Sequence, residues 1–203
     1  AKQLYPRVAY GRAMELINDQ NLVEGDRLLD KVLKDPNNAP VLSVTQFWKG
    51  EIAYRNNNLD DAIRYYNLYL DKAPAANGEA NPQNARYNLG YAYLRKENYK
   101  VAQGYFEQVA KTVRLNSPNI ERDAWMRNAD CHFMQKGFSS AQSMYAKAIE
   151  YSWPSADYAQ YQLAMIAGVS KPAEKISILN SFERKYPASE LVPLVNMEIA
   201  GTF

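Results

Sequence analysis

Cysteine and histidine are nearly absent from this sequence, which holds one residue of each, Cys131 and His132. A single cysteine excludes an intramolecular disulfide and any zinc site built from several cysteines. With one histidine there is no His-x-x-x-His metal motif, and no second histidine can serve as the usual general base. Adjacent residues on a helix point about 100° apart, so Cys131 and His132 do not converge on one point. We therefore predict that the chain is not an enzyme and holds no metal and no cofactor.

Long apolar runs and an excess of one charge are also missing. The longest purely apolar run lies near residues 163–169, which is far too short to span a bilayer. The 24 basic and 22 acidic residues leave a net charge of +2 and are spread along the whole chain. Ala1 is not followed by the charged start and apolar core of a signal peptide. We therefore expect neither nucleic-acid binding nor direct membrane insertion.

Tyrosine and small residues are what the sequence does contain in a pattern. There are 16 tyrosines against 6 phenylalanines and 3 tryptophans. Such an excess suits a fold with much half-buried surface, because tyrosine packs its ring while its hydroxyl stays wet. Four small residues recur at steps of 37, 40 and 39 positions, namely Gly25, Ala62, Ala102 and Ala141. Twelve positions before each of them stands another small residue: Ala13, Gly50, Gly90 and Ala129.

Each pair of small residues predicts the crossing of a helical hairpin. Two antiparallel helices approach closely only where the side chains between them are small, and large residues one turn away fill the surrounding space. Turn-forming residues stand four positions before the second residue of each pair: Asn21, Asn58, Asn98 and Gly137. Prolines, which cannot continue a helix, follow the predicted second helices: Pro36, Pro74, Pro118 and Pro154.

The pattern therefore predicts an all-α chain built from repeats. The repeats cover approximately residues 5–36, 43–74, 83–115, 122–154 and 157–187, with a partial sixth at 190–203. In the fifth repeat we expect helices over 158–167 and 173–186, and Lys175 replaces the small residue at its crossing. We interpret residues 1–203 as a single solenoid in which each hairpin contacts only its neighbours.

The residues around these crossings resemble the tetratricopeptide repeat. The stretch Tyr-Asn-Leu-Gly-Tyr-Ala-Tyr at 87–93, followed by Tyr99, Ala102 and Phe106, carries the resemblance clearly. Residues 47–54 with Ala62 and Pro74 are similar, and a third set consists of Trp125, Ala129, Phe138, Ala141, Tyr145 and Ala148. The resemblance covers nearly the whole chain. It implies a right-handed superhelical solenoid of about five hairpins plus a terminal helix, acting as a non-enzymatic scaffold for protein–protein interaction.

A narrower resemblance concerns the cellular setting. The Trp-Lys-Gly-Glu segment at 48–51, the Lys-Tyr-Pro-Ala-Ser ending at 185–189 and the long repeat period resemble bacterial cell-envelope repeat proteins. These are the periplasmic cell-division coordinator and outer-membrane assembly lipoprotein types, and large multi-repeat proteins of Bacteroidetes. The resemblance implies an adaptor in the periplasm or at the outer membrane, with a cytoplasmic location as the alternative.

The predicted functional feature is a surface rather than a point. In this repeat type the first helices line a concave groove, and aromatic and methionine side chains there are suited to holding a peptide. Residues at inward spacing along the first helices are Tyr10, Met14, Phe47, Glu51, Tyr54, Tyr87, Tyr91, Leu94, Met126, Asp130, Phe133, Tyr161 and Met165. The alternative for any one of these residues is that it packs against the neighbouring helix.

A clamp for a chaperone carboxylate is disfavoured among the possible peptide sites. Asn88 and Arg127 are the residue types that such a clamp uses, but Phe47, Glu51 and Asp130 occupy neighbouring inward positions and would repel a carboxylate.

A structural or assembly role is the alternative function, in which the chain is a segment of a longer multi-repeat envelope protein with no dedicated peptide ligand. Apolar residues recur at helical spacing over 191–203. Without a following helix, part of this stripe stays exposed, so we expect a longer native protein and self-association through the C-terminal helix.

Overall fold

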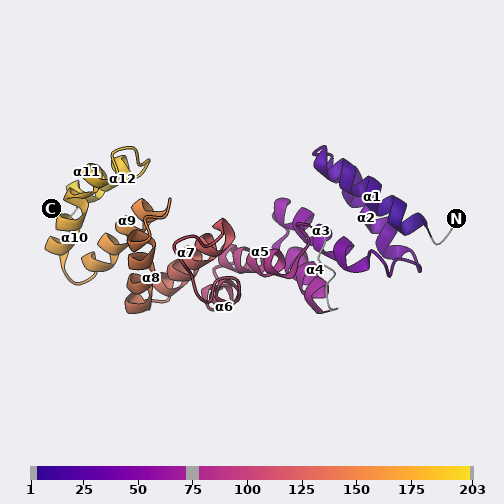
Figure 1. The fold of residues 1–203 in the computed structure, drawn as a ribbon, viewed down its shortest axis with the longest axis horizontal. Helices are drawn as coiled ribbons and strands as arrows, with labels where there is room; N and C mark the ends of the chain where they lie inside the picture. The colour runs from indigo at the N-terminus through magenta and orange to yellow at the C-terminus, as the bar shows by residue number, and fades with distance from the viewer. Residues whose placement is uncertain (1–3, 72–77, 202–203) are drawn as a thin grey trace. The chain divides into compact units, whose positions relative to one another are not determined.

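The computed structural model describes residues 4–71 and 78–201. These residues form helices and turns and, apart from a single bridge residue at Ala80, contain no β-structure (Figure 1). In chain order the helices are α1 (Tyr5–Asn18), α2 (Leu22–Lys34), α3 (Leu42–Arg55), α4 (Leu59–Asp71), α5 (Pro82–Arg95), α6 (Tyr99–Val109), α7 (Asn119–Met134), α8 (Phe138–Glu150), α9 (Ala156–Gly168), α10 (Pro172–Asn180), α11 (Phe182–Lys185) and α12 (Val192–Ala200). The prediction of an all-α chain is confirmed.

The helices fall into two compact units, which are described separately. Unit 1 is Ala1–Asn98 and contains α1 to α5, and unit 2 is Tyr99–Phe203 and contains α6 to α12. Within unit 1 each helix from α1 to α5 packs against the next one, and the same holds from α6 to α10 in unit 2. Helix α12 then contacts α10 and α11. The expected hairpins α1–α2 and α3–α4 are present in unit 1, and α7–α8 and α9–α10 in unit 2. The hairpin of α5 and α6, whose helices belong to different units, and one solenoid over the whole chain stay predictions.

The small residues predicted at the helix crossings are all buried. They are Ala13, Gly25, Gly50, Ala62, Gly90, Ala102, Ala129 and Ala141. A Cβ atom added to Gly25 would lie 2.8 Å from Ile17 Cγ1, and one added to Gly50 would lie 2.9 Å from the Tyr66 ring. Both distances are too short for a real side chain, so the close approach itself requires glycine there.

Four hairpin turns share a backbone feature that the sequence pattern did not predict. One residue in each turn is left-handed, with φ between 57° and 63°: Gln20, Asn57, Glu97 and Lys136. Each stands directly before a predicted turn residue, and two of those, Asn21 and Asn58, cap the following helix by accepting backbone N–H bonds. Gln, Glu and Lys have no preference for this conformation, so the sequence carried no signal for it.

Pro118 does not end the helix that it was predicted to end. Helix α6 already ends at Val109, and Pro118 instead precedes α7. The segment between them is held against the next hairpin. The Trp153 indole donates a hydrogen bond to the Leu115 carbonyl at 3.1 Å, and Val113 packs on the α7–α8 core. Tertiary contacts rather than proline chemistry set this boundary. Pro74 lies outside the described residues.

The second helix of the fifth hairpin is broken, where a single helix over 173–186 was expected. The break falls at Ser181, whose hydroxyl donates to the Ile178 carbonyl at 2.8 Å and so competes with the helical hydrogen bonds. The break turns Phe182 into the core, where it is 0% exposed. Lys175, the exception at the crossing, passes over Gly168 and forms an ion pair with Glu198 at 2.6 Å.

The C-terminal helix α12 buries much of its predicted apolar stripe. Val195 is 1% exposed and shares a core with Ala164, Leu179 and Phe182. Leu194 and Met197 remain exposed, as expected for part of the stripe. Phe203 lies outside the described residues.

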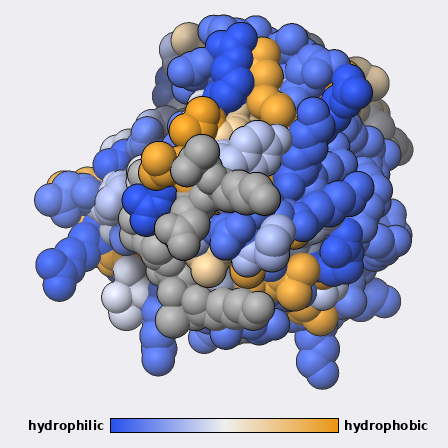
Figure 2. All heavy atoms as spheres, turned by 90° about the vertical axis from the view of Figure 1, so that its right-hand side faces the viewer, coloured by the Kyte–Doolittle hydropathy of each residue, from blue (hydrophilic) through white to orange (hydrophobic). Residues whose placement is uncertain are grey.

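One side of α3 packs against the preceding helix, α2. The corresponding side of α1 carries the polar residues Arg12 and Glu15. The positions of the buried Lys49 and Ile52 of α3 are taken in α1 by Arg12 and Glu15, which form an exposed ion pair at 2.6 Å. Figure 2 views the molecule from the side where α1 and α2 lie, and apolar groups appear there among many polar ones. Val8, one turn before Arg12, is 68% exposed, so this side of α1 is mixed in character.

The crossing geometry predicts opposite effects for two glycine-to-alanine changes. Gly50→Ala forces the buried Tyr66 ring to move and should lower the free energy of unfolding by about 1–3 kcal/mol. Gly11 lies on exposed α1 with no heavy atom within 4 Å of an added Cβ, so Gly11→Ala should raise stability by up to about 1 kcal/mol. Urea denaturation monitored by circular dichroism measures both changes. Equal effects for the two variants would show that the crossing is not tightly packed.

Candidate binding surface on the first helices

The residues predicted to contact a partner lie on the first helix of each hairpin, which is α1, α3 or α5 in unit 1 and α7 or α9 in unit 2. For Phe47 and Met126 the prediction is wrong, because they are 2% and 1% exposed and lie in the core. Both stand three positions before a crossing residue, as do the half-buried Tyr10, Tyr87 and Tyr161, so the position alone does not decide the burial. The Phe47 ring packs 5.6 Å from the Tyr66 ring of α4, between ring centroids.

The other predicted contact residues are half-buried, as expected for a surface that is partly packed and partly open. They are Tyr10, Met14, Glu51, Tyr54, Tyr87, Tyr91, Leu94, Asp130, Phe133, Tyr161 and Met165. Some of these side chains also support their neighbours. Tyr161 and Met165 pack against the core that includes α12, and Phe133 contacts Phe138 with ring centroids 5.7 Å apart. First helices contact each other in both units, α3 and α5 through Glu51 and Asn88 and α7 and α9 through Asp130 and Tyr158.

Glu51 of α3 is the centre of a polar network in unit 1. Tyr66 of α4 donates its hydroxyl to Glu51 Oε2 at 3.0 Å, and the Asn88 amide of α5 donates to the same oxygen at 3.1 Å and to the Tyr66 hydroxyl at 2.9 Å. The other oxygen, Oε1, accepts from Arg55 Nε at 2.9 Å. Three helices therefore meet at this carboxylate. Its charge is compensated internally, which removes the repulsion of an incoming carboxylate that the sequence predicted there.

Asp130 of α7 plays the corresponding part in unit 2. Tyr145 of α8 and Tyr158 of α9 donate to Asp130 Oδ1 at 2.6 and 3.0 Å, and Arg127 forms an ion pair with Oδ2 at 2.6 Å. Burial raises the pKa of the Asp130 carboxyl, and this effect outweighs the opposite influence of Arg127 and the two hydroxyls. Burial beside that carboxyl also raises the pKa of the Tyr158 hydroxyl to about 12.

A simple rule in the sequence accompanies the two networks. In two hairpins, the residue directly after the crossing residue of the first helix is acidic. In the same two hairpins, the residue four positions after the crossing residue of the second helix is tyrosine. The acidic pairs are Glu51 with Tyr66 and Asp130 with Tyr145, whereas the first and fifth hairpins have Met14 with Leu29 and Met165 with Leu179. A buried tyrosine hydroxyl needs a hydrogen-bond partner. The signal lies in the pairing of two positions on different helices, so inspecting each position by itself misses it.

Aromatic rings gather on α3 and α5 near these polar groups. Tyr87 and Tyr91, one helical turn apart on α5, pack edge to face with ring centroids 5.0 Å apart. One turn further along α5, the Arg95 guanidinium lies over the Tyr54 ring of α3, 5.0 Å from its centroid. We call Tyr54, Tyr87, Tyr91 and Arg95 the tyrosine face. It offers rigid ring area beside polar groups, which suits recognition of a protein segment.

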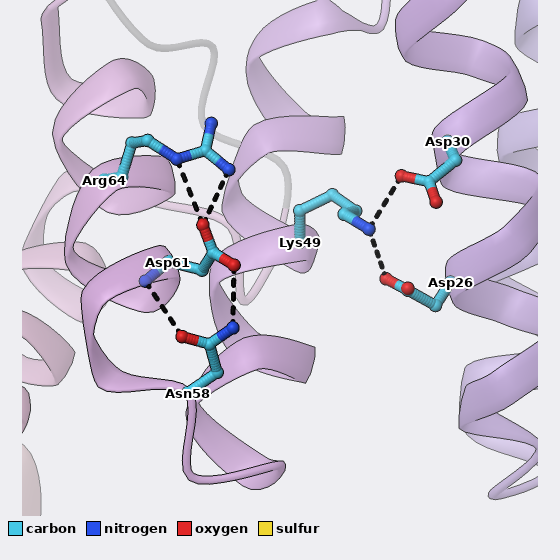
Figure 3. A network of polar contacts seen from close by, with 6 residues as sticks. All are labelled: Asp26, Asp30, Lys49, Asn58, Asp61 and Arg64. Carbon is cyan, nitrogen blue, oxygen red and sulfur yellow. Dashed lines mark hydrogen bonds and ion pairs between the residues drawn. The ribbon is translucent and has the colours of Figure 1, made fainter.

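The opposite side of α3 is tied to α2 by Lys49. Its ammonium group forms ion pairs with Asp26 at 2.7 Å and with Asp30 at 2.8 Å, and its side chain is 9% exposed (Figure 3). Burial disfavours the charge, but the hydrogen bonds and charges of the two carboxylates outweigh it, so the pKa of Lys49 is raised. A cleft of about 150 Å³ lies beside this group, with Asp61 and Tyr65 on its far wall. The charges here pair with one another, so the cluster connects two repeats.

Cys131 and His132 show packing roles in the structure. Cys131 is 0% exposed, and burial raises the pKa of its thiol to about 12, so the thiol is protonated at neutral pH. His132 lies against Gly137, with Nδ1 3.3 Å from where a glycine Cβ would stand. Across the residues that the structure describes, no group of three or more His, Cys, Asp or Glu could hold a metal ion. No helix in these ranges is long and apolar enough to cross a membrane.

The Glu51 network predicts strong coupling between its members. Tyr66→Phe or Glu51→Met alone leaves a half-buried polar partner unsatisfied and should cost about 1–3 kcal/mol of unfolding free energy. The double variant places apolar residues at both positions, as the first hairpin does. Its loss of unfolding free energy should be smaller than the sum of the two single losses, with a coupling energy of about 1 kcal/mol. Urea denaturation of the four proteins of the cycle measures this. Additive costs would mean that the hydrogen bond does not link the two residues.

Asp130 predicts a particular pH dependence of stability. Its pKa is raised in the folded state above the unfolded value of about 4. The folded protein therefore binds the proton more tightly, and the stability that Asp130 contributes grows as the pH falls through the folded pKa toward 4. Relative to Asp130→Asn, the wild-type chain should gain unfolding free energy between pH 7 and pH 4.5 in urea titrations. Parallel pH profiles of the two proteins would contradict this.

Comparisons with known proteins show what this chain is similar to. Residues 45–77 and 87–137 match the family model of the tetratricopeptide repeat. No match to the sequence is found among curated proteins. Three solved structures illustrate the fold, each sharing less than 20% identity with this chain.

A tetratricopeptide repeat protein from Parabacteroides merdae superposes with a TM-score of 0.73 at 14% identity, covering 98% of this chain and 72% of its own. YrrB, described as a tetratricopeptide repeat protein with an unusual peptide-binding site, gives 0.72 at 17% identity, with 93% and 90% covered. PilW, a type IV pilus biogenesis factor, gives 0.63 at 16% identity, with 97% and 85% covered. Residues 45–77 and 87–137 therefore match the tetratricopeptide repeat, and the chain shares the fold of solved tetratricopeptide repeat structures.

Proposed function

We propose that this chain is a protein-interaction scaffold and that the tyrosine face of unit 1 binds an extended or helical segment of a partner protein. The observation that supports this most directly is the set of half-buried rings on α3 and α5. Tyr54, Tyr87 and Tyr91 are half-buried, and the Tyr87 and Tyr91 rings pack against each other while Arg95 of α5 lies over the Tyr54 ring. Rigid aromatic groups contribute contact area at little cost in conformational entropy, which is typical of interface hot spots.

Asp130, Phe133, Tyr161 and Met165 form the corresponding proposed surface in unit 2. Asp130 lies on α7 within its hydrogen-bonded network, so it would be held in position before a partner arrives. Tyr161 and Met165 share contacts with the C-terminal core and keep less free area for a partner. We therefore assign the larger part of the binding energy to unit 1.

The cellular setting is a separate proposal. The resemblance of segments 48–51 and 185–189 to bacterial cell-envelope repeat proteins favours a periplasmic or outer-membrane-associated adaptor. Fractionation of the native organism, followed by immunodetection with antibodies against this chain, tests it. Recovery in the cytoplasmic fraction would contradict the proposal.

The tyrosine face predicts where substitutions weaken binding. Twelve-residue peptides selected from a random display library against the intact chain provide the ligands, and fluorescence polarisation provides their Kd values. Tyr87→Ala and Tyr91→Ala should each cost on the order of 2 kcal/mol of binding free energy, because each removes ring area from the contact. Circular dichroism and urea denaturation verify that the variants remain folded.

Tyr65→Ala on the second helix α4 is the matched control and should leave the Kd almost unchanged. Lys31→Ala on α2, an exposed residue, should also be silent. Equal losses from the tyrosine face and the control positions would place the contact elsewhere, as the alternative of an assembly segment requires.

A further inference from the structure

Arg95 is the charged group of the tyrosine face, and its surroundings are unusual. Its guanidinium lies over the Tyr54 ring, and Nη2 donates to the Asn57 side-chain oxygen at 2.6 Å. In the part of the chain that the structure describes, it forms no ion pair with a carboxylate. Glu97, in the turn after α5, is exposed and forms no ion pair with Arg95, and two other acids nearby have partners of their own. Glu51 is bonded on both oxygens, and Asp60 forms an ion pair with Lys96 at 2.6 Å.

Unit 2 also holds an arginine over a tyrosine ring of another first helix, although this arginine comes from a different position of the repeat. There the Arg127 guanidinium of α7 lies over the Tyr158 ring, 5.4 Å from its centroid. Arg127 has carboxylates from its own helix, Asp130 at 2.6 Å and Asp123 at 3.6 Å. In unit 2 the arginine over the ring thus forms ion pairs with aspartates of its own helix. Among the described residues of unit 1, the only side chain that Arg95 donates to is the neutral amide of Asn57.

A guanidinium held over an aromatic ring has most of its orientation already determined, so little entropy is lost when a carboxylate binds its free N–H groups. Arg55 and Arg95 occupy equivalent positions, five residues after Gly50 and Gly90, and Glu51 compensates only the first of them. Arg95 is therefore a positive group at this edge of the tyrosine face that no carboxylate of the described residues pairs with, and a partner can complement it.

We infer that the partner segment bound by the tyrosine face carries an aspartate or glutamate side chain that pairs with Arg95 above the Tyr54 ring. The inference rests on the proposed function and adds the charge of the ligand. The segment places apolar side chains on Tyr87 and Tyr91 and its carboxylate about one helical turn further along α5. The site consists of one arginine lying over one aromatic ring. It therefore binds a single carboxylate of a side chain within the segment, rather than the C-terminal carboxylate of a partner chain.

Three synthetic peptides test the inference directly with the full chain. They share the same phenylalanine and leucine positions, and the residues between these are glutamate in the first, glutamine in the second and lysine in the third. Fluorescence anisotropy of the labelled peptides at about 50 mM salt gives the Kd values. The glutamate peptide should bind about three- to fivefold more tightly than the glutamine peptide, and the lysine peptide more weakly than both. Raising the salt to about 300 mM should reduce the difference.

Arg95→Gln should bring the glutamate and glutamine peptides to equal affinity, and Arg95→Lys should retain part of the preference for glutamate. Arg64→Gln on α4, an arginine already paired with Asp61, is the matched control and should keep the full preference. Equal binding of all three peptides that still depends on Tyr87 and Tyr91 would overturn this inference and leave the proposed function intact. If none of the peptides binds, or if binding is insensitive to both tyrosines, the proposed function fails together with the inference.

Discussion

The close approach of paired helices at their crossings is the constraint on which the other features of each unit depend. At Gly50 the backbone of α3 comes so near α4 that the Tyr66 ring lies directly against it. The ring is thereby fully buried and its hydroxyl is carried to the far side of the hairpin. There it meets Glu51, the residue that follows the crossing, and Asn88 from α5. One small residue thus leads to a buried ring, and the ring leads to a polar contact among three helices.

Polar contacts of this kind join the helices beside the proposed binding surface. The Glu51 and Asp130 carboxylates look like exposed negative charge in the sequence, but each is surrounded by donors from its own unit. Buried charges need such compensation, because removing them from water is costly. Glu51 and Asp130 are therefore part of the hydrogen-bonded structure of their units, and the charge that we propose a partner contacts is that of Arg95.

The repeat architecture could be predicted because it depends on spacing. Ala13, Ala62 and Ala141 fall in regular columns, and each is buried at the crossing where the columns placed it. Departures from the prediction occur where tertiary contacts compete with local preference. Val109 ends α6 because the following segment is held by Trp153, and Ser181 breaks a helix so that Phe182 can enter the C-terminal core. Neither outcome follows from the helix propensity of the residues concerned.

The sequence by itself determined the all-α class, the positions of most hairpins and the tyrosine-rich character of the first helices, because helical periodicity and small-residue spacing are local properties of the chain. Only the tertiary structure decided which side of each first helix stays open. Phe47 and Tyr54 are both inward-spaced aromatic residues of α3, yet one is core and the other lies beneath Arg95. The difference arises because a helix in a repeat is packed on several sides, and the angle between neighbouring helices, which no single segment encodes, selects the residues that remain accessible.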